Sequence, residues 1–249
     1  MISEQGFHAT ARRNKCYVSI FIRKFRLIIS LIPNIIGVRD MKCTEFKKKL
    51  RKYPYITTAV FGSFPGSQKT LYNQINQWVK TGEVVKLRRG LYTLNEDDRK
   101  VGLSLNLAAN AIYSPSYVSL ESALSHYGMI PEAVFAVTSV TAKKTQSFSN
   151  PLGQFIYRSV KKAAFFGFTA VRDEFGFDCL VALPEKALLD YLYFNAPSRG
   201  PAWVSFFDES MRLQNADQLD LKKIEEMAAK MGSRKLTGAI AALKKWMKR

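Results

Sequence analysis

The stretch SQKTLYNQINQWVKTGEVVKLRRGLYTL, from Ser67 to Leu94, decides how this part of the chain folds. Its first half predicts a helix in which the Ser67 side chain caps the first turn and Gly82 ends the last. Apolar positions recur at i, i+4, i+7 and i+8 and form one stripe: Leu71, Ile75, Trp78 and Val79. The expected outer face carries amides, hydroxyls and ammonium groups but no carboxylate: Gln68, Lys69, Tyr72, Asn73, Asn76, Gln77 and Lys80.

A short basic β-hairpin is expected directly after this helix. Val85 and Leu87 should face one side of its first strand, and Lys86 and Arg88 the other. Arg89-Gly90 makes the turn at its tip. Taken alone, the helix fits equally well an ordinary amphipathic helix whose solvent side lacks acids. A basic hairpin after an acid-free helix is typical of a winged helix-turn-helix, whose helix reads a major groove while its hairpin, the wing, holds phosphates or enters a minor groove.

The residues before this stretch complete a compact basic unit over residues 41–95. A first helix is expected over 44–52, with Thr44 as its cap and with Phe46 and Leu50 on its inner face. A second short helix, capped by a threonine, should run over 57–61. Together with the helix from Ser67, these elements supply the three helices that a winged helix-turn-helix needs.

The positive charge of the chain is concentrated around this unit. The formal net charge is +18, from 38 basic and 20 acidic side chains. Residues 41–94 hold 11 basic and 2 acidic side chains, an excess of nine, whereas residues 95–249 hold 20 and 16. Such a field attracts polyanions, because neutralised phosphates release condensed counterions. A basic surface that serves only solubility is the alternative, and it fits residues 95–249 better than residues 41–94.

Residues 1–40 are expected to be an extension from a misplaced start codon, because Met41 opens what reads as a complete domain start. Their apolar segment, residues 27–38, follows basic residues and imitates a signal peptide, but no small-x-small cleavage site follows it. It is also shorter than the roughly 20 residues that span a bilayer, so no membrane association is expected. The three cysteines lack disulfide or metal-ligand spacing, which favours the cytoplasm and predicts no metal.

Residues 96–249 predict a larger mixed α/β domain that ends in helices. The run Asn95-Glu96-Asp97-Asp98 should cap its first helix, over 99–113. Two further helices are expected over 119–127 and 184–194, and the last 50 residues should form two or three more. The β-branched and aromatic runs predict strands over 134–141, 155–160, 168–172 and 177–181. The expected fold class is therefore α+β.

Three separate motifs carry a resemblance to a known family. They are GEVVKLRRGLYTL at 82–94, SYVSLESALSHYGMIP at 116–131 and LVALPEKALLDYLY at 180–193. In order and spacing they resemble the AbiEi antitoxin family of abortive-infection, type IV toxin–antitoxin systems. The likeness covers about residues 41–195, and the remaining C-terminal residues agree only in helical character.

The resemblance implies a cytoplasmic repressor that binds double-stranded DNA at inverted repeats in its own promoter, uses no cofactor and is not an enzyme. It also implies that the chain counteracts a nucleotidyltransferase toxin encoded beside it, through its C-terminal domain and without a stable complex. On DNA the protein is expected to be a monomer or a weak dimer, with cooperative binding left open. The expected DNA contacts are Ser67, Gln68, Lys69, Tyr72, Asn73, Asn76, Gln77, Lys80, Lys86, Arg88 and Arg89. Those most expected to reach bases are Lys69, Asn73, Asn76 and Gln77.

Signals for other chemistry are weaker. Residues 62–70 resemble a phosphate loop only faintly, because Gln68 stands where a Walker A motif has glycine. The glycine-serine pair at 62–63 is not followed by the paired carboxylates that a nucleotidyltransferase needs for Mg²⁺. His126 is expected to serve a helix end rather than catalysis. The charged residues of LPEKALLD, at 183–190, predict a buried ion pair or a solvated first turn.

Two alternative functions stay open. One is an enzyme that acts on the toxin, on nucleotide or on tRNA through residues 99–249. The other is a plain winged-helix transcription factor with an unrelated ligand-binding domain.

Overall fold

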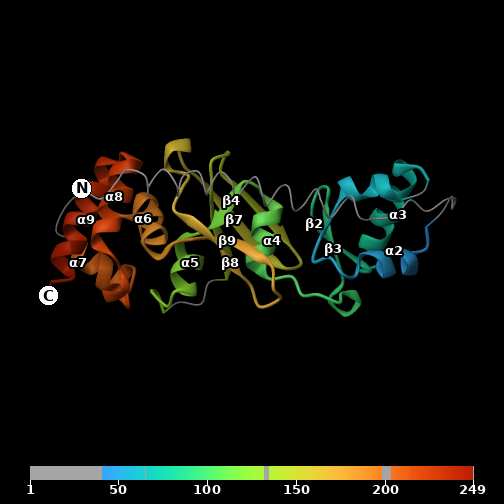
Figure 1. Ribbon diagram of the computed structural model, residues 1–249, viewed down its shortest axis with the longest axis horizontal. Helices are drawn as coiled ribbons and strands as arrows, with labels where there is room; N and C mark the ends of the chain where they lie inside the picture. Colours follow the sequence, from blue (N-terminus) through green and yellow to red (C-terminus); the bar gives the residue numbers. More distant parts are fainter. Residues whose placement is uncertain (1–40, 65, 132–134, 198–202, 249) are drawn as a thin grey trace, which may run out of the picture. The chain divides into compact units, whose positions relative to one another are not determined.

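The computed structural model describes residues 41–64, 66–131, 135–197 and 203–248 (Figure 1). The described chain is a mixed α+β protein with two β-sheets, as the sequence predicts at that level. The expectations for residues 1–40 and for a strand start at Val134 lie outside the described residues. The chain divides into two compact units.

The first unit comprises residues 41–112 together with the short segments Ser149–Leu152 and Arg172–Phe177. Its elements, in chain order, are α2 (Cys43–Leu50), β1 (Ile56–Thr57), the 3-10 helix η1 (Thr58–Ser63), α3 (Gln68–Lys80), β2 (Val84–Arg88), β3 (Leu91–Leu94), the 3-10 helix η2 (Glu96–Asp98) and α4 (Leu105–Ile112). The three strands form one antiparallel sheet in the order β1-β3-β2. The strands β2 and β3 are therefore the expected hairpin.

An aromatic and aliphatic cluster joins α2, α3 and this sheet into one core. The ring of Phe46 on α2 lies 5.7 Å from that of Phe64 and 5.0 Å from that of Trp78, between centroids. Phe46 and Leu50 are both buried, which confirms their expected inward orientation. Burying a side chain of this size contributes about 1.5–3 kcal/mol, so this contact fixes α2 against α3.

The expected cap of the first short helix is wrong, and that of the second is confirmed in position but not in its hydrogen bond. Lys42, and not Thr44, stands at the N-cap of α2, and no side chain caps that helix. The second helix is present as η1, a 3-10 helix over Thr58–Ser63, with Thr57 at its N-cap as the sequence allows but without a side-chain cap hydrogen bond. The apolar pattern located these helices because their inner faces are buried, whereas cap hydrogen bonds depend on the local geometry of the turn before each helix.

The helix expected over 99–113 is also wrong in its first half, since α4 begins only at Leu105. The Asn95 side chain does cap a helical turn, accepting the Glu96 N–H at 2.7 Å, but that turn is the separate η2. At the start of α4 the Ser104 hydroxyl accepts the Leu107 N–H at 3.2 Å. Two successive capping groups therefore divide a run that the sequence pattern joins.

The second unit comprises Tyr113–Phe148, Gly153–Val171 and Asp178–Arg249. Its elements include β4 (Ser116–Val118), α5 (Leu120–His126), β5 (Ala136–Thr141), β6 (Gln146–Asn150), β7 (Gly153–Ser159), η3 (Lys162–Ala164), β8 (Phe168–Arg172), β9 (Asp178–Ala182) and α6 (Pro184–Asn195). The remaining elements are α7 (Trp203–Ser205), the π-helical turn η4 (Phe206–Ser210), η5 (Ala216–Gln218), α8 (Leu221–Met231) and α9 (Arg234–Trp246).

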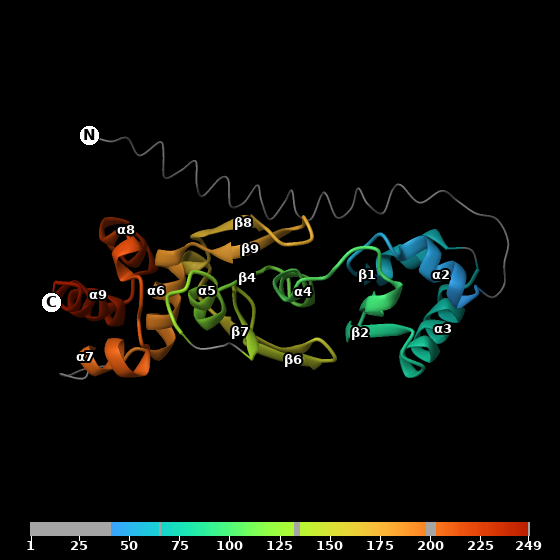
Figure 2. The ribbon, with the colours of Figure 1, turned by 90° about the horizontal axis from the view of Figure 1, so that it is seen from below.

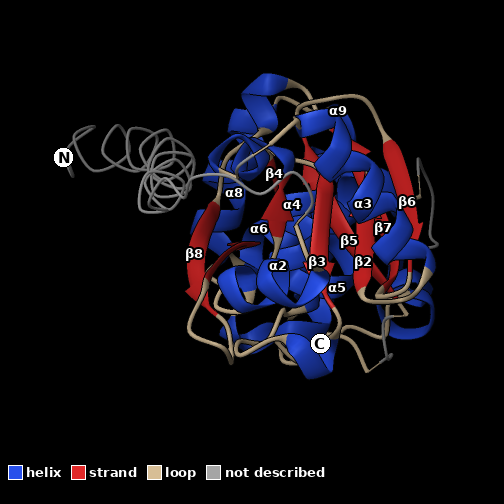
Figure 3. Ribbon diagram, turned by 90° about the vertical axis from the view of Figure 1, so that its right-hand side faces the viewer, coloured by secondary structure: helices blue, strands red, loops and turns tan. Residues whose placement is uncertain are grey.

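The six strands form one mixed sheet in the order β6-β7-β5-β4-β9-β8, so that β6 and β8 are its two edges (Figure 3). β5 runs parallel to β7 and β4 parallel to β9, while β4 and β5 are antiparallel. α5 packs against β5 and α6, and the helices α7, α8 and α9 gather beside α6 (Figure 2).

Most elements predicted for the second unit are confirmed, namely the two helices α5 and α6 and the strands β5, β7, β8 and β9. Pro184 occupies the first turn of α6, as expected. The sequence reasoning missed β4 and β6. Both are short, and β6 is a polar, mostly exposed edge strand whose pattern does not show a buried face.

Candidate nucleic-acid interface

The helix α3 buries the apolar stripe that the sequence predicts. Leu71 and Ile75 are 5% and 0% exposed, and Trp78 and Val79 pack partly buried against the same core. Ser67 stands at the N-cap, as expected, but its side chain makes no cap hydrogen bond. Its backbone carbonyl accepts the Leu71 N–H instead, at 3.1 Å. The exposed Ser67 therefore presents its hydroxyl at the start of the helix, where it does not cap the first turn.

The side of α3 away from the core carries most of the predicted contact residues. Ser67, Gln68, Lys69, Asn73, Gln77 and Lys80 are exposed. Asn76 is half-buried on the same side. Gln74, which was not among the predicted contacts, faces elsewhere, since its amide donates to the Met41 carbonyl at 3.2 Å.

Tyr72 differs from the other predicted contacts, because its ring packs against the core and is only partly exposed. It lies at the margin of the apolar stripe, next to Tyr92 of β3. Burial, followed by the neighbouring Tyr72 hydroxyl, raises the pKa of Tyr92 to about 12. Tyr72 is therefore partly a core residue, and the expectation of a fully outward side chain is wrong.

The strand β2 carries a β-bulge that changes which of its side chains face inward. Lys86 pairs with Tyr92 and Arg88 pairs with the adjacent Leu91, so Leu87 is an extra residue on β2 with no partner on β3. As a result Val84 and Leu87 are buried, whereas Val85 is only half-buried. The expected pair Val85 and Leu87 is therefore wrong at Val85. A bulge adds one residue to one strand and reverses the alternation beyond it.

The tip of the hairpin exposes the three basic residues that the sequence selects, Lys86, Arg88 and Arg89. The Arg88 guanidinium donates from Nη1 to the Arg89 carbonyl at 3.1 Å, which braces the turn. Gly90 has φ +79°, a backbone conformation that residues other than glycine rarely adopt. Its carbonyl accepts the Thr58 N–H at 3.1 Å. The tip is thus held to the segment that leads from β1 into η1.

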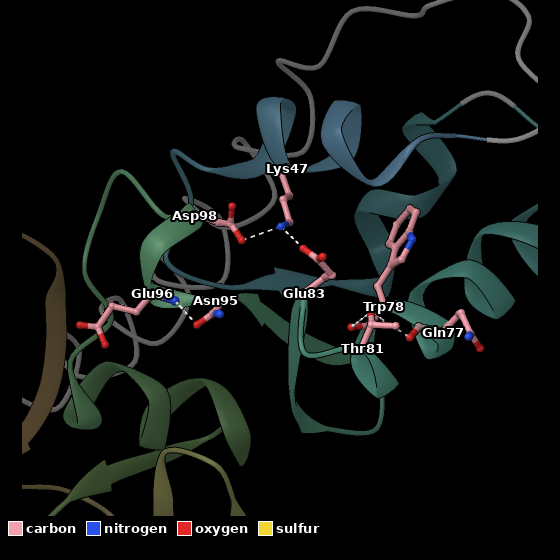
Figure 4. Close-up of polar contacts among 8 residues, drawn as sticks. All are labelled: Lys47, Gln77, Trp78, Thr81, Glu83, Asn95, Glu96 and Asp98. Atoms are coloured by element: carbon pink, nitrogen blue, oxygen red, sulfur yellow. Dashed lines mark hydrogen bonds and ion pairs between the residues drawn. The ribbon is translucent and has the colours of Figure 1, made fainter.

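A Schellman motif links the end of α3 to the start of β2. Gly82 has φ +79° and donates to the Val79 carbonyl at 3.3 Å, while the Glu83 N–H reaches the Trp78 carbonyl at 2.9 Å. The Thr81 hydroxyl adds a bond of 3.2 Å to the Trp78 carbonyl (Figure 4). These bonds fix the backbone at Glu83, one residue before β2 begins.

One ammonium group gathers two carboxylates at the base of the hairpin. Lys47 of α2 forms ion pairs with Glu83 and, at 2.7 Å, with Asp98 at the end of η2 (Figure 4). Partial burial works against the charge of Lys47, but hydrogen bonds and attraction from Asp98 and Glu83 outweigh it and raise the pKa of the ammonium. Sequence reasoning missed this triad. Its members are far apart along the chain, and no local pattern marks them.

The resulting surface combines hydrogen-bonding side chains on a helix with basic side chains on a hairpin. The only two acids of residues 41–94 are Glu45, on the exposed side of α2, and Glu83, which Lys47 pairs. Amides pair with base edges, and lysine or arginine side chains pair with phosphates. Chemically, the arrangement suits a polyanion that presents both phosphates and hydrogen-bonding edges.

The charged residues of LPEKALLD form a buried network in the second unit, which is the first of the two structural alternatives that the sequence leaves open. Lys186 and Asp190 are fully buried and form an ion pair. The Tyr117 and Ser119 hydroxyls each donate to the second Asp190 oxygen at 2.9 Å. Burial lowers the pKa of Lys186, with Asp190 opposing, and the same burial raises that of Tyr117.

This network fills the core and holds α6 to β4, and the neighbouring Glu185 pairs with Lys223 of α8 at 2.8 Å. His126 is exposed at the end of α5, with its ring against that of Tyr127. Within the described ranges, no group of three or more acidic, histidine or cysteine side chains is arranged to hold a metal ion. None of the helices described is long and apolar enough to cross a bilayer.

No protein-family model matches the chain, and no curated protein matches it significantly.

Proposed function

We propose that residues 41–95 form a winged helix-turn-helix that binds double-stranded DNA. In this proposal α3 enters the major groove and the β2–β3 hairpin is the wing. The observation that carries it is the carboxylate-free outer face of α3, followed at once by a hairpin whose exposed tip is basic. An amphipathic helix that only covered a core would need no such hairpin beside it.

The side chains divide by what their chemistry can contact. Asn73, Asn76 and Gln77 offer amides that pair with adenine edges, and Lys69 reaches guanine or phosphate. Ser67 and Gln68 lie at the start of α3, where backbone N–H groups favour an anion. Five residues mainly position the phosphate backbone: Tyr72, Lys80, Lys86, Arg88 and Arg89. Of these, Tyr72 contributes only its hydroxyl edge, since its ring packs against the core.

Titration of the protein against fluorescent DNA duplexes tests this proposal. One duplex carries the region upstream of the gene, and the other has the same bases in shuffled order. Specific sites are bound about 10³-fold or more tightly than non-specific DNA, so a large preference for the upstream duplex is expected. Equal affinity for the two duplexes would contradict sequence-specific binding.

At a finer level we propose that the protein is the antitoxin of a type IV toxin–antitoxin system that represses its own operon. The three motifs that resemble the AbiEi family support this, and the second unit would carry the antitoxin action. A neighbouring nucleotidyltransferase gene is expected, whose product arrests growth unless this protein is co-expressed. A neighbour of another kind, or arrest that co-expression does not relieve, argues against it.

The proposal assigns no catalytic step to this protein. Toxin incubated with it and ATP should therefore keep its mass, and the two proteins should elute separately in size-exclusion chromatography. A mass increase of the toxin would instead favour an enzyme that modifies it. A cytoplasmic location, without membrane association, belongs to the same proposal.

A further inference from the structure

We propose that Lys47, Glu83 and Asp98 form a clamp that positions the wing against α3, an inference that rests on the proposed DNA-binding function. The three residues are called the Lys47 clamp below. They are positioning residues, since none is expected to touch DNA. The clamp acts through the hairpin, by fixing the direction in which its basic tip points while α3 lies in the groove.

The clamp closes on both ends of the hairpin at once. Glu83 directly precedes β2, and Asp98 lies four residues after β3 ends. A single ammonium from α2 pairs with both carboxylates, and the Lys47 side chain is only 19% exposed (Figure 4). α2 is itself fixed to α3 through Phe46 and Trp78. The clamp therefore ties the base of the hairpin to the same core that orients α3.

Further contacts hold the hairpin near its tip. β1 pairs with Leu91 and Tyr92 of β3, and Thr58 binds the Gly90 carbonyl. At its base Val84 and Leu94 are buried in the core, and the ion pairs of Lys47 add directed contacts that set the angle of the hairpin to α2 and α3. A five-residue strand such as β2 spans about 16 Å, so a tilt of about 10° relative to α3 would displace one end of the strand by about 3 Å against that helix. Such a shift equals the length of one hydrogen bond and is enough to break contacts with bases or phosphates.

The negative charges of Glu83 and Asp98 distinguish a positioning role from simple attraction of DNA. Carboxylates beside a phosphate-binding surface repel DNA, so a surface selected for positive charge alone would lack Glu83 and Asp98. If charge alone mattered, removing either carboxylate would tighten binding. If the clamp positions the wing, removing one weakens specific binding even though the protein becomes more positive.

The test compares Glu83→Gln and Asp98→Asn with Glu45→Gln in the full chain, using the upstream and shuffled duplexes. Each variant raises the net charge by one, but Glu45 lies exposed on α2 outside the clamp. Glu83→Gln and Asp98→Asn should each bind the upstream duplex about fivefold more weakly, which is the scale of one partly exposed ion pair. All three should bind the shuffled duplex as well as the wild type or slightly better. Retained affinity for the shuffled duplex also shows that the variants are folded.

Two variants of the lysine complete the test. Lys47→Met should lose the preference for the upstream duplex as Glu83→Gln does, and Lys47→Arg should keep it. If Glu83→Gln matches Glu45→Gln or binds the upstream duplex more tightly, the clamp is overturned while the proposed function stands. If the wild type itself shows no preference between the duplexes, the proposed function falls and the clamp with it.

Discussion

Replacing Lys186 by methionine should destabilise the second unit strongly, although the residue lies far along the chain from the proposed DNA surface. Lys186 and Asp190 are both fully buried, so the substitution leaves a carboxylate in the core without its cation. Removing one partner of a buried ion pair costs about 3–5 kcal/mol. Asp190 keeps two hydroxyl donors at 2.9 Å, from Tyr117 and Ser119. Because these donors still stabilise the carboxylate, the expected loss of stability is at the lower end of that range, about 3 kcal/mol.

Methionine is the suitable replacement because the lysine stem itself packs closely. A Cβ built on Gly167 would lie 2.9 Å from the Lys186 Cγ, so a shorter side chain would add a cavity to the loss of charge. A loss of about 3 kcal/mol corresponds to a fall in melting temperature of about 6–12 °C for a domain of this size. Thermal and urea unfolding, followed by circular dichroism, measure both quantities.

The companion variant Lys186→Met with Asp190→Asn separates charge from packing. Asparagine still accepts from Tyr117 and Ser119 but carries no charge, so most of the lost stability should return. If Lys186→Met lies within about 1 kcal/mol of the wild type, the prediction is wrong, since the unpaired buried charge then costs too little free energy of folding. A double variant as unstable as the single one would show that charge is not the cause.

Two further predictions concern the first unit. Arg88→Ala with Arg89→Ala should weaken binding to both duplexes and reduce the slope of log K against log salt by about 0.9 per lost phosphate contact, and an unchanged slope would remove the wing from the interface. Because the pKa of Tyr92 rises to about 12 in the folded protein while that of an unfolded tyrosine is about 10, this unit should lose stability as pH rises from about 10 to 12. Tyr92→Phe should flatten that alkaline loss in a pH series of urea unfolding curves, and an equally steep loss in the variant would assign it to another group.

The sequence predicts the elements whose signals are local. The apolar stripe of α3 depends on spacing within one helix, and Leu71 and Ile75 are buried as that spacing requires. Pro184 and the apolar residues after it likewise place α6 almost to the residue. The hairpin after Gly82 follows from a helix stop, a basic strand and a glycine turn, all within a few residues.

What the sequence does not predict depends on partners that are distant along the chain. The bulge in β2 appears only when that strand pairs with β3, and it moves the inward position from Val85 to Val84. Tyr72 turns toward the core because Tyr92 of another element lies there. The ion pairs of Lys47 join residues from three elements, and periodicity carries no information about such contacts.

In the proposed function the outer face of α3 reads a DNA sequence. The most direct test is the ratio of affinities for the upstream and shuffled duplexes, measured for the wild type and for Asn73→Ala with Gln77→Ala, both exposed positions on that face. A large ratio is expected for the wild type and, at about 1–3 kcal/mol per lost base contact, a ratio at least tenfold smaller for the variant, with shuffled-duplex affinity unchanged. An equal ratio in the two proteins would show that this face of α3 does not read the sequence.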